Sequence, residues 1–167
     1  MAKTKKEINY VEQHNKAVLR FQKTALFLLW AGVVSLIAIL ISVLRTDSGL
    51  GMALSINIFL NNLINGTSLS DVLKKLLIFI FALITGALFA ALGYFARLGK
   101  LVFLLIGTSL YVLDFALTFF IYPLAFSSAF TFSIATHVVI LGALGIAIYY
   151  YFLVIKLSKS QGAIINE

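Results

Sequence analysis

Hydrophobic residues form four long runs along this chain, over residues 24–44, 76–96, 101–122 and 132–155. Each run is close to the ~20 residues that an α-helix needs to cross a hydrocarbon core of ~30 Å. The polar connections between the runs are short, except for residues 46–75, so no separate soluble domain fits. The pattern therefore predicts one domain over 1–167, an all-α integral membrane four-helix bundle.

Composition agrees with this pattern, because 62% of the residues are hydrophobic, only 11% are charged and the mean hydropathy is +1.06. Soluble domains carry about 25% charged residues. The run 24–44 follows a basic segment, as in a signal peptide, but it is too long and no small-x-small cleavage site follows Leu44. We interpret this run as a membrane anchor. The absence of cysteine from the sequence excludes disulfides, thiolate nucleophiles and thiolate metal sites.

The net charge of +7 comes from basic residues that flank the apolar runs. This placement favours membrane orientation and anionic lipid over nucleic acid as its explanation. Segment 1–23, turn 97–100 and the C-terminus hold six, two and two Lys or Arg, whereas the other side holds Arg45, Lys74 and Lys75. The positive-inside rule therefore predicts a cytoplasmic membrane with both termini in the cytoplasm. Five basic residues are expected to contact lipid headgroups: Lys16, Arg20, Lys23, Arg97 and Lys100.

Segment 1–23 has apolar residues at helical spacing within a basic background. This predicts an amphipathic helix that lies in the cytoplasmic interface and leads into the first span. A plain basic flank that sets topology is the alternative. The stripe consists of Ile8, Val11, His14, Val18 and Phe21.

The long connection 46–75 holds a second amphipathic segment, 51–65, which is too polar to cross a membrane alone. Its helical faces predict an interfacial helix at the outer surface, or a re-entrant helix shielded by protein. Asn65-Gly66 indicates a turn, after which Ser68 or Ser70 caps the next helix. The apolar face carries Met52, Ile56, Phe59, Leu60 and Leu63, and Asn57, Asn61 and Asn62 lie mostly on the other.

The run 76–96 contains a stripe of small residues, Gly86, Ala90 and Gly93. Small residues at this spacing let two helix backbones approach closely in a membrane. We therefore expect this helix to lie inside the bundle against its neighbours.

The last two runs contain two side chains that titrate at ordinary pH, Asp114 and His137. They lie about 12 Å and 8 Å below the outer ends of consecutive antiparallel helices, at 1.5 Å per residue. Tyr111 and Thr118 share the helical face of Asp114. The sequence therefore predicts a candidate buried polar or proton site formed by these four residues.

A carboxylate in the middle of a membrane helix costs roughly 2.5–3.5 kcal/mol, so Asp114 should pair, protonate or face water. One interpretation is a hydrogen bond that holds two helices in register. The other is a proton- or cation-responsive site, because burial disfavours a charged carboxylate while a neighbouring imidazolium favours it. Arg45, Lys74 and Lys75 are rival partners for Asp114. One His and one Asp are too few for a zinc site, so we expect neither a metal nor a cofactor.

The sequence around the acid is Gly107-Thr108-Ser109-Leu110-Tyr111-Val112-Leu113-Asp114, and His137 follows in the next run. This C-terminal third resembles a G-x-x-L-Y-x-L-D … H pattern of small four-span bacterial membrane proteins of unassigned function. The resemblance implies a bacterial cytoplasmic membrane and importance of the same polar residues. It implies no reaction.

No enzyme motif is present: the sequence has no HExxH, GxSxG or P-loop pattern. The first functional hypothesis is therefore a non-enzymatic membrane protein, either an accessory subunit of a larger complex or a small-molecule binding module. Its expected partners are the lipid bilayer and a second copy or other membrane subunits, not nucleic acid. The alternative is a small oligomeric proton- or cation-linked transporter or channel that uses Asp114 and His137. A membrane enzyme is the third hypothesis.

Overall fold

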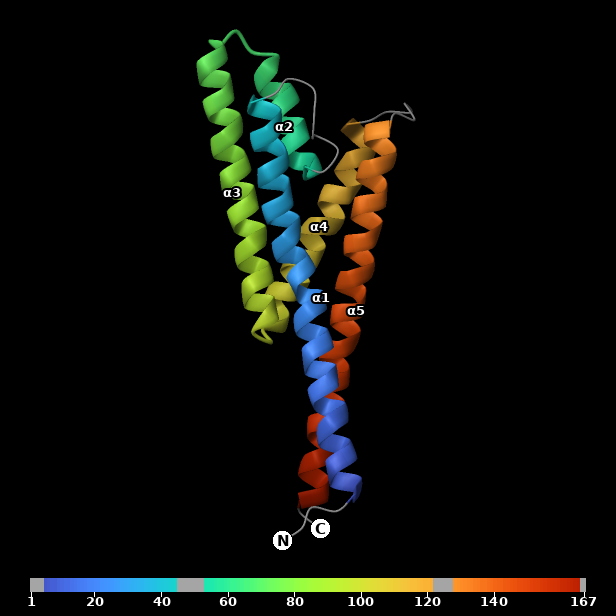
Figure 1. The fold of residues 1–167 in the computed structure, drawn as a ribbon. Coiled ribbons are helices and arrows are strands. Elements are labelled where there is room, and N and C mark those ends of the chain that lie inside the picture. Colours follow the sequence, from blue (N-terminus) through green and yellow to red (C-terminus); the bar gives the residue numbers. More distant parts are fainter. Residues whose placement is uncertain (1–4, 45–52, 122–127, 166–167) are drawn as a thin grey trace.

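A computed structural model of the chain describes residues 5–44, 53–121 and 128–165, which hold five helices and no strand (Figure 1). The sequence expectations for Arg45 and Met52 lie outside these described residues. The helices are α1 (Lys5–Leu44), α2 (Ser55–Asn65), α3 (Asp71–Arg97), α4 (Leu101–Ile121) and α5 (Ser128–Ile165).

Four of these helices, α1, α3, α4 and α5, are long and apolar enough to cross a membrane. This confirms the predicted set of four spans and makes the chain a multi-pass membrane protein by the length and composition of its helices. Several helix boundaries differ from the predicted runs. Helix α3 begins at Asp71 rather than 76, and α5 continues to Ile165 rather than ending at 155.

Helix α1 corrects the expectation of a separate interfacial helix over 1–23. It runs without a break from Lys5 to Leu44, and its first part lies alongside the last part of α5, beyond the α3–α4 turn (Figure 1). Buried residues recur along it at Ala17, Phe21, Ala25 and Leu28, so one seam continues from the basic segment into the span. Polar contacts join the two helices, because the Tyr10 hydroxyl donates to the carbonyl of Leu157.

Helices α1 and α3 pack closely through glycine. A Cβ atom on Gly93 would lie 2.8 Å from Cα of Leu29, and one on Gly86 would lie 3.1 Å from the carbonyl oxygen of Gly32. A Cβ on Gly32 would lie 3.0 Å from the backbone nitrogen of Ala90. The small residues of α3 therefore face α1, and Gly32 is a partner in this contact that the sequence did not single out.

Helix α2 begins inside the bundle and rises toward the end that carries the α2–α3 connection (Figure 1). Asn57 is 2% exposed, whereas Phe59 and Leu63 are 44% and 59% exposed. Helix α2 therefore turns the polar side chain of Asn57 into the protein and the apolar side chains of Phe59 and Leu63 outward. Helix α2 thus begins among the other helices and buries a polar side chain there.

The α2–α3 connection places Ser70 at the N-cap position of α3 with an extended backbone, and Asp71 in the first turn. The Ser70 side chain makes no capping hydrogen bond, and Ser68 is not at the cap. Lys74 donates from Nζ to the carbonyl oxygen of Asn65 at 3.2 Å, so it serves the C-terminus of α2. A cation at that end complements the helix dipole.

Candidate functional site

The first turn of α2 is held by the carboxylate of Asp114 on α4. The backbone N–H of Ser55 donates to Oδ2 at 3.0 Å, and that of Ile56 donates to Oδ1 at 2.9 Å. The first N–H groups of a helix have no partner within the helix, and a carboxylate there also complements the helix dipole. Leu54 occupies the N-cap position and has no side chain that could do this. Asp114 therefore acts as the cap of α2 from another helix.

Small polar side chains of the other spans complete the attachment of this turn. Ser35 of α1 accepts the N–H of Leu54 at 2.8 Å and the side-chain amide of Asn57 at 2.9 Å. The Thr85 hydroxyl of α3 donates to Asn57 Oδ1 at 2.8 Å. The hydroxyls of Ser55 and Thr118 lie 2.6 Å apart. We call the residues that hold α2, namely Ser35, Thr85, Asp114, Thr118 and His137, the α2 docking site.

His137 of α5 joins this site through Asp114. Its Nε2 lies 3.0 Å from Oδ2 of Asp114, and both side chains are 3% exposed. Its Nδ1 lies 2.8 Å from the carbonyl oxygen of Ser133, which can only accept, so Nδ1 carries a hydrogen. The contact between Nε2 and Oδ2 then holds one further proton. Two backbone donors bind the same carboxylate, so three hydrogen bonds converge on Asp114.

The imidazole of His137 lies near two aromatic rings. The centroid of Tyr111 is 5.1 Å from that of the imidazole, and the centroid of Phe115 is 5.4 Å away. Both rings pack against the imidazole and keep it beside Asp114. Tyr111 and Thr118 are both buried and lie on the face of α4 that carries Asp114.

The structure thus brings together Asp114, His137, Tyr111 and Thr118, the four residues singled out from the sequence. It does not use Lys74 as a partner for Asp114, because that ammonium binds at the opposite end of α2. The main partners that the sequence did not reveal are the backbone amides of Ser55 and Ile56. Ser35 and Thr85 were also missed, because a single hydroxyl in an apolar run is a weak signal.

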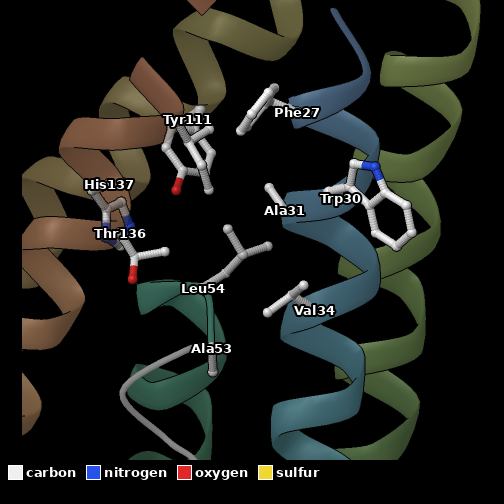
Figure 2. Close-up of a pocket in the computed structure, with 10 residues that line it drawn as sticks. Phe27, Trp30, Ala31, Val34, Ala53, Leu54, Tyr111, Thr136 and His137 are labelled. Carbon is white, nitrogen blue, oxygen red and sulfur yellow. The ribbon is translucent and has the colours of Figure 1, made fainter. Parts of the chain in front are cut away.

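Two cavities flank the pair on different sides. A cavity of about 200 Å³ lies between α1, α4 and α5, and His137 and Tyr111 line it (Figure 2). A cavity of about 320 Å³ lies between α3 and α4, where Asp114 and Thr85 line it. The proton of the pair therefore lies between two spaces, one bordered by its imidazole and the other by its carboxylate.

The basic residues expected at lipid headgroups lie along the lower part of α1 and at the α3–α4 turn. Lys16 pairs with Glu12 at 2.6 Å, and the Arg20 guanidinium donates to the Tyr150 hydroxyl at 2.6 Å. Lys100 lies over the rings of Phe95 and Phe103, and Lys23 and Arg97 are exposed. Among the described residues, no group of three side chains could hold a metal ion.

Comparison of the chain with known protein families, with curated proteins and with solved structures finds no match. The resemblance that rests on Tyr111, Asp114 and His137 therefore stays a prediction.

Proposed function

We propose that this protein is a non-enzymatic membrane protein that binds a small, mostly apolar molecule with one polar group. The observation that carries the proposal is the cavity between α1, α4 and α5. Figure 2 shows Tyr111 and His137 on one side of it and Phe27, Ala31 and Val34 of α1 on the other. A mostly apolar cavity with a few convergent polar groups is typical of small-molecule sites.

The size of the cavity limits the ligand. A dry apolar cavity of about 150 Å³ accepts benzene. The 200 Å³ here therefore fits one ring with a few substituent atoms. Among the described residues, none forms a hydrogen bond with the Tyr111 hydroxyl, which is directed into this space (Figure 2). That hydroxyl is free to bind the polar group of the ligand.

Orientation and partners belong to the same proposal. The excess of Lys and Arg on α1, on the turn 97–100 and on the end of α5 supports termini in the cytoplasm. The cavity then lies in the outer half of the bilayer. Apolar side chains such as Val138, Val139 and Ile146 cover an exposed face of α5. This face fits lipid, a second copy or another subunit of a membrane complex.

The proposal predicts that the protein distinguishes p-cresol from toluene, two rings of similar shape. We expect p-cresol to bind about tenfold more tightly, since one neutral hydrogen bond contributes roughly 1.4 kcal/mol. Tyr111→Phe should remove this preference while leaving toluene binding unchanged. Trp30 lines the cavity and is the single tryptophan of the sequence, so its fluorescence measures binding to the purified protein.

A cavity-filling pair of variants controls this experiment. Val34→Phe places a ring in the cavity and should abolish binding of both probes, whereas Val112→Phe adds the same ring on an exposed face. Unchanged binding in Val34→Phe, or an equal preference in wild type and Tyr111→Phe, would contradict the proposal.

A second candidate function is proton-linked transport or a channel. It is supported by the single proton shared by Asp114 and His137 between two cavities. Intramembrane ionisable residues that face a cavity are typical of proton and ion pathways. Four spans rarely enclose a pathway alone, so this function requires an oligomer.

This candidate predicts that His137→Gln lowers proton flux into proteoliposomes at least tenfold, measured with a pH-sensitive dye in the lumen. Glutamine can still donate to Asp114, so α2 stays docked, but it cannot carry the proton. The control is His14→Gln, which changes the other histidine, located where α1 meets α5 and hydrogen-bonded to Ser158. Equal flux in wild type and His137→Gln would exclude this function.

A further inference from the structure

A third hollow lies at the other end of the spans, where the α3–α4 turn meets α1 and α5. Its volume is about 330 Å³, and Arg97 and Leu98 of the turn, Gln22 of α1 and Tyr151 of α5 line it. We infer that it binds the phosphate group of one anionic phospholipid. The inference is independent of the small-molecule cavity, which lies beside α2.

Three of the side chains that line this hollow carry hydrogen-bond donors. They are the guanidinium of Arg97, the side-chain amide of Gln22 and the hydroxyl of Tyr151. Among the described residues, none forms a hydrogen bond or ion pair with these three groups. Two other cations of α1 do have partners in the protein, since Arg20 is hydrogen-bonded to Tyr150 and Lys16 is paired with Glu12. A guanidinium presents its donors in a fork that matches two phosphate oxygens.

The chain builds the hollow from a tight turn and an uninterrupted helix. Gly99 has a φ of 85°, a backbone conformation that glycine adopts without strain, and it turns the chain sharply from α3 into α4. This holds Arg97 against the middle of α1, which continues past the turn (Figure 1). Phe21, Leu98 and Val154 supply apolar walls on which the glycerol and the start of an acyl chain can lie.

Charge and depth favour an anionic lipid. Helix α3 ends at this turn and α4 begins there, so the turn lies where a membrane span meets the headgroups. Of the acidic side chains that the structure describes, Glu12 is paired with Lys16, and Asp71 and Asp114 lie toward the other end of the bundle. A basic hollow between spans is a known type of headgroup site. The apolar walls favour a phospholipid over a soluble phosphate ester.

The test is native mass spectrometry of the full-length protein titrated with phosphatidylglycerol or phosphatidylcholine. We expect one phosphatidylglycerol per chain, bound at least tenfold more tightly than phosphatidylcholine. Arg97→Gln should weaken phosphatidylglycerol binding more than tenfold, since the hydrogen-bonded contact between the guanidinium and the phosphate is lost. Lys159→Gln removes one positive charge from α5 outside the hollow. It should lower the affinity for phosphatidylglycerol about fivefold or less, as expected for a cation that attracts anionic lipid without contacting it.

Equal losses in Arg97→Gln and Lys159→Gln would overturn the inference, because the attraction would then be diffuse. Equal affinity for the two lipids would also overturn it. A further arm adds glycerol 3-phosphate at millimolar concentration. Displacement of the lipid by this soluble ester would overturn the assignment to a phospholipid, whereas failure to displace it supports the assignment.

Discussion

Asp114→Asn is expected to lower the free energy of unfolding by about 3–5 kcal/mol, the usual effect of breaking a buried, hydrogen-bonded pair. Three donors converge on the carboxylate, namely the N–H groups of Ser55 and Ile56 and the imidazole of His137. Asparagine has one oxygen in place of two, so its own N–H₂ group must face one of these donors. The first turn of α2 then loses its cap.

Two measurements check this result. Thermal unfolding in detergent reports the loss of stability. Undocking of α2 is reported by a cysteine introduced at Ala53, which is 2% exposed and precedes α2. The sequence has no cysteine, so a thiol reagent labels this position alone. Labelling should be slow with Asp114 present and fast in Asp114→Asn.

Ser133→Ala is the matched control for Asp114→Asn. The Ser133 hydroxyl is buried and has no hydrogen-bond partner among the described residues. Because removing an unpaired polar group loses no hydrogen bond, the free energy of unfolding of Ser133→Ala should differ from that of wild type by less than about 0.5 kcal/mol. Equal stability of Asp114→Asn and Ser133→Ala would show that the carboxylate does not hold α2.

Gly93→Ala is expected to destabilise the protein by about 1–3 kcal/mol, the cost of overpacking a close contact. The added Cβ would lie 2.8 Å from Cα of Leu29 and would meet backbone rather than the end of a flexible side chain. Helices α1 and α3 would have to separate, and their contact also includes Gly32 and Gly86. Chemical denaturation of the reconstituted protein measures the loss.

Gly142→Ala provides the control on α5. A Cβ at Gly142 would have no atom within 4 Å, and alanine is a better helix former than glycine by about 0.5–1 kcal/mol. This variant should therefore be as stable as wild type or more stable. If Gly93→Ala behaved in the same way, the close packing of α1 on α3 would be refuted.

The four spans were predictable because their length and apolarity are set by the bilayer. The proximity of Asp114 and His137 was predictable for a related reason: an acid in lipid needs a partner, and a histidine lies at similar depth on the next helix. The stripe Gly86, Ala90 and Gly93 indicated a helix contact, although the pattern does not say which neighbour it meets.

The attachment of α2 was not predictable from residue types. The donors that bind Asp114 are backbone amides of Ser55 and Ile56, which every residue except proline possesses. The apolar positions of α2 indicated a membrane-facing surface. They did not reveal that Asn57 is buried and hydrogen-bonded to Ser35 and Thr85. It makes these bonds because a buried polar group without a partner is costly. The continuity of α1 was missed because the polar and basic composition of its first part gives no sign that it packs along α5.

The carboxylate of Asp114 caps helix α2 in this structure. Solid-state NMR of the reconstituted protein tests it directly, by the dipolar coupling between the ¹³C-labelled carboxyl of Asp114 and the ¹⁵N-labelled amide of Ile56. With Oδ1 2.9 Å from that nitrogen, we predict a measurable coupling, because a hydrogen-bonded pair places carbon and nitrogen roughly 4 Å apart or less. No measurable coupling, together with rapid hydrogen exchange of the Ile56 amide, would contradict the account.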